Sequence, residues 1–122
     1  MTVSHSATLR IGFANDVLAA IDAGVGVGNL VLRTAANVEV ATLPLAAPAG
    51  VVSGALLTFG TITSDAAATG GKAAICTIED SDGNVALTGT VALSGGDLNM
   101  SSLDIEAGAN VSVSFLSYTA PA

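Results

Sequence analysis

Residues 73–93, AAICTIEDSDGNVALTGTVAL, show the clearest alternation of apolar and polar positions in the chain. The dipeptide Asp82-Gly83 separates two β-rich runs, and an Asp-Gly pair in that setting predicts a tight hairpin with positive φ at both turn positions. The register that follows pairs Ser81 with Asn84, Ile78 with Leu87, Cys76 with Gly89, and Ala74 with Val91. One face then carries Ala74, Cys76, Ile78, Val85, Leu87, Val91 and Leu93. We therefore predict a central hairpin with one buried face.

Residues 7–23, ATLRIGFANDVLAAIDA, carry the one helical period in the sequence. Ser6 is a suitable N-cap, and Gly24 is suited to a left-handed stop. Asp16 and Asp22 lie off the apolar stripe and are expected to face solvent. The stripe consists of Leu9, Phe13, Val17 and Ile21, widened by Ala14, Leu18 and Ala20. We predict an amphipathic helix over 7–23, preceded by a flexible arm at residues 1–6.

The remainder of the chain, residues 29–118, reads as short strands separated by turns rich in Gly and Pro. Pro44, Pro48 and Gly50 indicate a loop, and residues 65–71 are expected to form an exposed, flexible loop. The predicted strands cover 30–34, 38–43, 55–63, 98–100, 103–105 and 111–117 in addition to the hairpin. This spacing favours an all-β fold class, a single β-sandwich domain over 1–122 with the topology of a jelly roll.

The composition adds two constraints on partners. Apolar residues make up 51% of the chain and charged residues 11%, so we expect copies of the chain or another protein to cover part of the surface. The net charge is −7, and the three basic residues Arg10, Arg33 and Lys72 are widely separated, which argues against nucleic-acid binding. The uncharged run between Glu39 and Asp65 contains two prolines and several glycines, so no membrane association is expected.

No catalytic or metal-binding motif emerges from the sequence. Asp80, Asp82 and Asn84 match the first ligand positions of a calcium loop, but valines occupy the glycine and closing glutamate positions, so turn chemistry is the favoured interpretation. His5 is the one histidine, which leaves no convincing Ser-His-Asp triad. Cys76 is expected to be a buried, inert thiol. We therefore expect a protein that is not an enzyme and has no cofactor or metal.

Three stretches carry a resemblance to a known group of proteins. They are SATLRIGFANDVLAAIDAG followed by GNLVLRT, the hairpin IEDSDGNVALTGTV, and the closing AGANVSVSFLSYTAPA. Together they resemble small virion proteins of tailed bacteriophages that are similar to capsid decoration, or cement, proteins. The resemblance implies a structural protein on the capsid exterior that binds the major capsid protein, bridges adjacent capsomers, and associates with itself as a homo-dimer or homo-trimer.

The resemblance also suggests where contacts form. An N-terminal segment over 4–10 and a loop over 46–54 are expected to touch the capsid or a neighbouring subunit. The candidate contact residues are Ser4, His5, Leu9, Arg10, Phe13, Pro48, Val51 and Val52. Two alternatives stay open at this point: a tail, spike or fibre component of the virion, and an adhesive β-domain of a cell surface.

Overall fold

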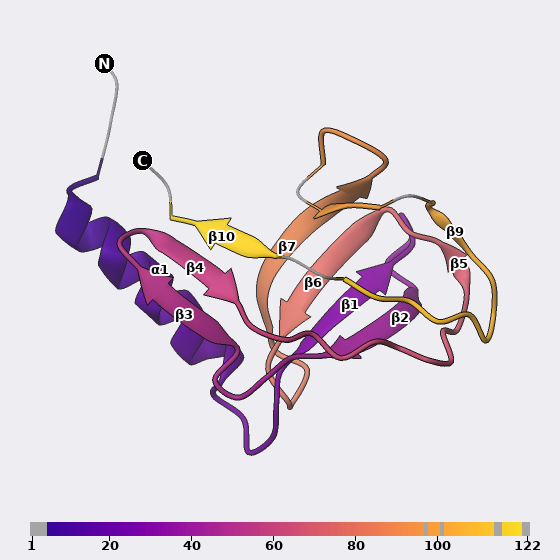
Figure 1. Cartoon of the computed structure of the whole chain (residues 1–122), viewed down its shortest axis with the longest axis horizontal. Helices are drawn as coiled ribbons and strands as arrows, with labels where there is room; N and C mark the ends of the chain where they lie inside the picture. The colour runs from indigo at the N-terminus through magenta and orange to yellow at the C-terminus, as the bar shows by residue number, and fades with distance from the viewer. Residues whose placement is uncertain (1–4, 97, 101, 114–115, 121–122) are drawn as a thin grey trace.

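One N-terminal helix, α1 (Ala7–Ile21), leads into a chain of short β-strands (Figure 1). The computed structural model describes residues 5–96, 98–100, 102–113 and 116–120. The strands in chain order are β1 (Asn29–Arg33), β2 (Glu39–Pro44), β3 (Gly50–Ser53), β4 (Leu56–Phe59), β5 (Gly71–Lys72), β6 (Ile75–Glu79), β7 (Val85–Ala92), β8 (Leu98–Asn99), β9 (Asp104–Ile105) and β10 (Ser117–Thr119). The prediction of a mostly β chain with an N-terminal helix is confirmed.

The helix starts as predicted and ends two residues early. The Ser6 hydroxyl accepts a hydrogen bond from the Leu9 amide at 3.2 Å, which is the expected N-cap. The helix ends at Ile21, and Asp22 is its C-cap with φ −90°. The prediction of a left-handed stop at Gly24 is wrong, because Gly24 is not among the residues with positive φ. Asp22, expected in solvent, instead accepts a hydrogen bond from a main-chain amide of another segment.

That hydrogen bond joins the end of the helix to the start of β3. The Asp22 carboxylate lies 3.1 Å from the Ala49 amide nitrogen, and Ala49 is buried. A buried amide without a partner would be costly, so the carboxylate satisfies a donor that no strand pairs. The C-terminal end of α1 is thereby fixed against the segment that precedes β3.

The apolar stripe of the helix is buried along only part of its length. Ala14 and Ile21 are buried, whereas Leu9 is 53% exposed. Helix α1 packs against β3, β4 and β7. A four-residue strand spans about 13 Å and a 15-residue helix about 22 Å, so the first helical turn extends past the strands. Ala20, also assigned to the stripe, is exposed. The predicted stripe is therefore correct from Phe13 to Leu18 and at Ile21, and wrong at Leu9 and Ala20.

The predicted hairpin forms the middle of a five-stranded sheet with the order β2-β1-β6-β7-β8. Strands β6 and β7 pair in the expected register, with Cys76 opposite Gly89 and Ile78 opposite Leu87. Strand β1 lies on the other side of β6 and is antiparallel to it. The apolar pattern therefore fixed the pairing over most of the hairpin, because a slip of one residue would have turned its apolar face outward.

The turn of the hairpin differs from the prediction. The Asp80 amide donates to the Asn84 carbonyl at 3.0 Å, so three residues form the loop instead of two. Gly83 has φ +87°, while Asp82 is not in the left-handed region, as in a type I turn followed by a bulge. A register shift beside Ile78 absorbs the extra residue. The predicted pairing of Ser81 with Asn84 is therefore wrong.

Two residues predicted on the buried face of the hairpin are exposed. Val85 pairs with Glu79 beyond the bulge, and it is 54% exposed. A shift of one residue moves a side chain to the opposite face, which accounts for Val85. Leu93 is 62% exposed because it follows the last residue of β7.

A second sheet has the order β10-β4-β3. Strand β3 lies within the segment 46–54 that was expected to be a loop, and it pairs with β4 across a tight turn in which Gly54 has φ +60°. The strand predicted over 55–63 ends at Phe59. Beyond it, the Gly60 amide donates to the Ala49 carbonyl, which continues the antiparallel pairing of the two segments by one residue.

Residues 63–70 cover the outer edge of β2, although an exposed loop was expected over 65–71. Three hydrogen bonds replace a neighbouring strand there: Thr63 N to Pro44 O at 2.8 Å, Thr42 N to Asp65 Oδ2 at 2.9 Å, and Gly70 N to Val40 O at 3.1 Å. Ala68 is buried. An open strand edge can pair with another chain, and this segment protects the β2 edge from such pairing.

The core contains side chains from both sheets and the helix. Leu30 and Leu32 of β1, Leu57 of β4 and Ile21 of α1 are fully buried in one cluster.

The strand expected over 111–117 is not observed as one continuous strand. Val111 makes an isolated bridge to Asp65, residues 114–115 lie outside the described residues, and β10 begins at Ser117.

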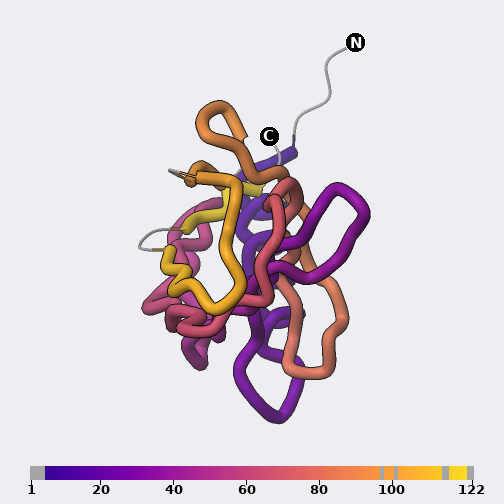
Figure 2. Tube along the Cα trace, turned by 90° about the vertical axis from the view of Figure 1, so that its right-hand side faces the viewer, coloured from indigo at the N-terminus to yellow at the C-terminus, as the bar shows by residue number. Residues whose placement is uncertain are grey.

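The loop after α1 and the β6–β7 turn project together at one end of the molecule (Figure 2). The Gly26 amide donates to the Ser81 hydroxyl at 3.2 Å. A Cβ atom added at Gly24 would lie 1.7 Å from the same hydroxyl. Gly24 is therefore required for close packing against the hairpin, and not for a left-handed conformation.

Candidate interaction surfaces

The start of the predicted contact arm packs against its own helix. Ser4 lies outside the described residues. The His5 ring meets the Phe13 ring edge to face, with centroids 5.2 Å apart and an interplanar angle of 81°. Both residues are half-buried. The two rings therefore stabilise the entry to α1.

Leu9 and Arg10 differ in how far they are available to a partner. Leu9 presents more than half of its surface to solvent. The Arg10 guanidinium donates to the Ala120 carbonyl at 3.2 Å and ties α1 to the end of β10. Arg10 is thus used within the chain, and Leu9 is the exposed apolar residue of the pair.

The predicted contact residues around β3 point in opposite directions. Pro48 is exposed and Val51 is 69% exposed, whereas Val52 is half-buried and packs against the core. Successive residues of a strand face opposite sides of a sheet. Helix α1 contributes to the same core as Val52, so Val51 lies on the side of the sheet away from the helix. The structure therefore does not bring the seven candidate residues that it describes together into one surface.

Val51 belongs to an uncharged outward face of the second sheet, which we call the outer β3–β4–β10 face. Its residues follow from the strand register and are Val51, Ser53, Leu56, Thr58, Ser117 and Thr119. Leu56 is 39% exposed, and Ser53, Ser117 and Thr119 are exposed. The absence of charge on this face is in keeping with a chain in which charged residues make up 11%. The exposed aliphatic side chains of Val51 and Leu56 and the absence of charge suit contact with another protein surface.

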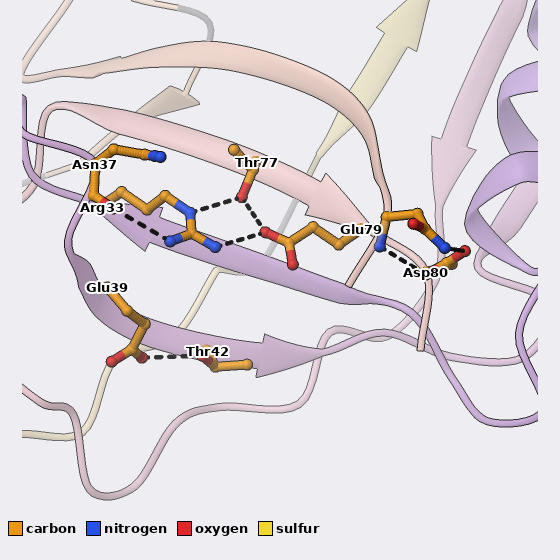
Figure 3. A network of polar contacts seen from close by, with 8 residues as sticks. Arg33, Asn37, Glu39, Thr42, Thr77, Glu79 and Asp80 are labelled. Atoms are coloured by element: carbon orange, nitrogen blue, oxygen red, sulfur yellow. Dashed lines mark hydrogen bonds and ion pairs between the residues drawn. The ribbon is translucent and has the colours of Figure 1, made fainter. Parts of the chain in front are cut away.

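The opposite, outward side of the five-stranded sheet carries a polar network that the sequence analysis missed (Figure 3). The Arg33 guanidinium lies 2.8 Å from a carboxylate oxygen of Glu79, and its Nε donates to the Thr77 hydroxyl at 3.2 Å. The same hydroxyl donates to Glu79. Thr77 and Glu79 are buried although they lie on the outward side. The network is therefore structural: each buried polar group has a partner.

The β2 edge of that sheet has a second set of polar contacts. Glu39 accepts hydrogen bonds from the hydroxyls of Thr42 and Thr69, one with each carboxylate oxygen. Figure 3 shows Glu39 and Thr42 on the strand next to Arg33. The contact with Thr69 joins β2 to residues 63–70, which cover its edge. The alternating pattern of β2 could not predict this contact, because Thr69 is 30 residues away from Glu39 along the chain.

Asp80 organises the hairpin turn in which calcium binding was considered. Its carboxylate accepts hydrogen bonds from the main-chain amides of Asp82 and Asn84, both at 2.9 Å, and from the Asn84 side chain at 3.1 Å. The Asn84 side chain and then its amide lower the pKa of Asp80 below the ordinary value of 3.8, while burial opposes the shift. Both carboxylate oxygens of Asp80 therefore accept hydrogen bonds within the turn, in keeping with the favoured interpretation of these residues as turn residues.

The low pKa of Asp80 gives a prediction for acid stability. Because the folded-state pKa is lower than the unfolded one, the ionised carboxylate stabilises the fold above about pH 4, and this contribution is lost as the pH falls through the folded pKa. We expect Asp80→Ala to lower the thermal midpoint at pH 7. The gap to the unmodified protein should narrow as the pH falls toward 2. Thermal unfolding followed by circular dichroism checks this, and a constant gap from pH 7 to pH 2 would contradict it.

A cavity of about 300 Å³ lies where the two sheets meet at β7 and β10. Cys76 is in its lining and is 5% exposed, so the predicted burial of this thiol is confirmed. No charged residue is in the lining. The lining residues are Phe59, Cys76, Ile78, Leu87, Thr88, Gly89, Leu116, Ser117, Tyr118 and Thr119.

The described residues contain no group of three or more His, Cys, Asp and Glu side chains placed to hold a metal ion. Within the same part of the chain, α1 is too short to be a candidate membrane span. Comparison of the chain with family models, curated proteins and solved structures finds no significant match. The surfaces described above are therefore the basis for a functional proposal.

Proposed function

We propose that this chain is a structural virion protein of a tailed bacteriophage, a decoration protein that binds the outside of the capsid. Its partner would be the major capsid protein, and it would stabilise the contacts between adjacent capsomers. The outer β3–β4–β10 face is the observation that carries the proposal, because it offers aliphatic and hydroxyl side chains without charge on an otherwise acidic chain. The assignment to a phage capsid comes from the sequence resemblance noted above, which the comparisons with known proteins do not reproduce.

The proposal extends to the arrangement of the sheets. We propose that the five-stranded and three-stranded sheets form a β-sandwich related to a jelly roll, with the shared core between them. Side chains of Leu30, Leu57 and Phe59 in one cluster support this arrangement. A stiff body of this kind transmits load between neighbouring capsomers, and many identical weak contacts repeated over a shell become strong together.

A charge placed on the outer face tests the site of binding. Val51→Asp puts a carboxylate on the proposed contact, and Val25→Asp is the matched control, because Val25 is also an exposed valine but lies in the loop after α1. We expect Val51→Asp to weaken binding to undecorated capsid shells at least about tenfold, since the charge would lose water without gaining a partner. Val25→Asp should bind as the unmodified protein does.

Co-sedimentation of each variant with shells over a range of protein concentrations measures the effect. Circular dichroism confirms that both variants fold. Equal binding by the two variants would remove the outer face from the proposal, and no binding by the unmodified protein would overturn the decoration function itself.

A further inference from the structure

The cavity where the two sheets meet has a floor of buried side chains and a mouth of exposed residues. Its volume is about 300 Å³. Phe59, Cys76 and Leu116 line it and are buried. Thr88 and Ser117 also line it and are exposed. The cavity is therefore open to solvent at one end and mostly apolar inside.

A pair of small residues in the central hairpin accounts for the position of the cavity. Cys76 and Gly89 face each other across β6 and β7, and Ile78 faces Leu87 two residues further on. Residues two apart along a strand lie on the same face of a sheet. Ile78 and Leu87 contribute large side chains to the core, whereas Cys76 is small and Gly89 has no side chain. The hairpin sequence therefore leaves room between the sheets beside Cys76.

The main chain of β10 supplies hydrogen-bonding groups at the mouth. The Phe59 amide donates to the Leu116 carbonyl at 3.0 Å, so the main-chain groups of Leu116 and Tyr118 point to β4. The main-chain groups of Ser117 and Thr119 alternate with them and point away from β4. Both residues line the cavity. A polar group of a bound molecule would therefore meet main-chain donors and acceptors at the mouth.

We propose that this cavity binds a small, neutral aromatic molecule of two fused rings, with one hydrogen-bonding group directed to the mouth. An apolar cavity of about 150 Å³ holds one benzene ring, so about twice that volume admits two rings. Phe59 and Tyr118 offer aromatic surfaces for edge-to-face or offset contacts with such a molecule.

The charge of the ligand follows from the lining. None of the described residues that line the cavity is charged. A charged group inside would lose its water without gaining a partner, so neutral molecules are favoured. The tests below use the purified protein alone, and their results do not depend on the capsid proposal.

Calorimetric titration with indole measures the binding, because indole has two fused rings and a single N–H donor. We expect saturable binding of one indole per chain, with a rise in the thermal midpoint as the indole concentration increases. Benzene would fill only about half of the cavity and should bind about tenfold more weakly. Heats that do not saturate with indole, or benzene bound as tightly as indole, would overturn the proposal.

Two substitutions at Cys76 distinguish the volume of the cavity from the chemistry of the thiol. Cys76→Phe places a ring in about half of the cavity and should weaken indole binding at least about tenfold. Cys76→Ala is the matched control, because it removes the thiol, leaves the volume open and should bind indole as the unmodified protein does. Circular dichroism checks that both variants fold. Unchanged indole binding by a folded Cys76→Phe variant would overturn the proposal.

Methyl chemical shifts locate the bound indole in the unmodified protein, without any substitution. The methyl resonances of Ile78 and Leu87 should shift on addition of indole, because the rings would lie against these side chains. Val40 and Leu43 are buried in the same core but do not line the cavity, so their resonances should stay in place. Shifts of equal size at all four residues, or none at Ile78 and Leu87, would overturn the proposal.

Discussion

Gly28→Ala is expected to lower the free energy of unfolding by about 3 kcal/mol. A Cβ atom at Gly28 would lie 2.5 Å from the Glu79 carbonyl oxygen and 2.8 Å from Cγ2 of Ile21. Ile21 is fully buried, and the Glu79 carbonyl belongs to the central strand β6. Neither neighbour can move without displacing the helix or the sheet.

Gly12→Ala is the matched control for this prediction. Nothing beyond its own helix lies within 4 Å of a Cβ atom placed at Gly12. Gly12 is in the middle of α1, where alanine is favoured over glycine by about 1 kcal/mol. Urea unfolding of both variants should therefore shift the midpoint in opposite directions. A Gly28→Ala variant as stable as the unmodified protein would contradict the close packing of helix, sheet and loop.

Glu79→Ala is expected to lower the free energy of unfolding by about 2 kcal/mol. The Glu79 side chain is 9% exposed and that of Arg33 is 22% exposed. Removing the carboxylate leaves Nη2 of the partly buried Arg33 guanidinium and the Thr77 hydroxyl without the acceptor that they share. The effect is below that of a fully buried pair, because water reaches the exposed part of Arg33.

The double variant Arg33→Met with Glu79→Leu distinguishes the contribution of the ion pair to the free energy of unfolding from the contribution of side-chain packing. Both charges are then absent, and the apolar side chains still cover Val31 beneath them. We expect the double variant to recover to within about 1 kcal/mol of the unmodified protein. A double-mutant cycle measured by urea unfolding gives the coupling energy between Arg33 and Glu79. Single and double variants that destabilise additively would contradict the network.

Local pattern and turn chemistry predicted the elements that depend on neighbouring residues. The N-cap at Ser6 and the register of Cys76 with Gly89 follow from spacing within a few residues, and both are observed. The turn at Asp80 was wrong by one residue, because the side-chain hydrogen bonds of Asp80 favour a three-residue loop over the two-residue loop that Asp-Gly suggests.

Contacts between distant segments were not predictable from those patterns. The partner of Arg33 is 46 residues away along the chain, and the segment over Thr42 comes from residues 63–70. Such pairs depend on strand order, which periodicity does not encode. The candidate contact residues lie on different surfaces for a related reason. Val51 and Val52 were assigned to one surface because a loop was expected over 46–54, whereas they belong to strand β3 and face opposite sides of its sheet.

The most direct test of the proposed function is the number of copies that bind an undecorated capsid shell at saturation, together with the temperature at which the shell is disrupted. A decoration protein binds at a fixed number of copies per capsomer and raises the disruption temperature, because each copy bridges neighbouring capsomers. Binding without saturation, or saturation with no change in the disruption temperature, would contradict the account.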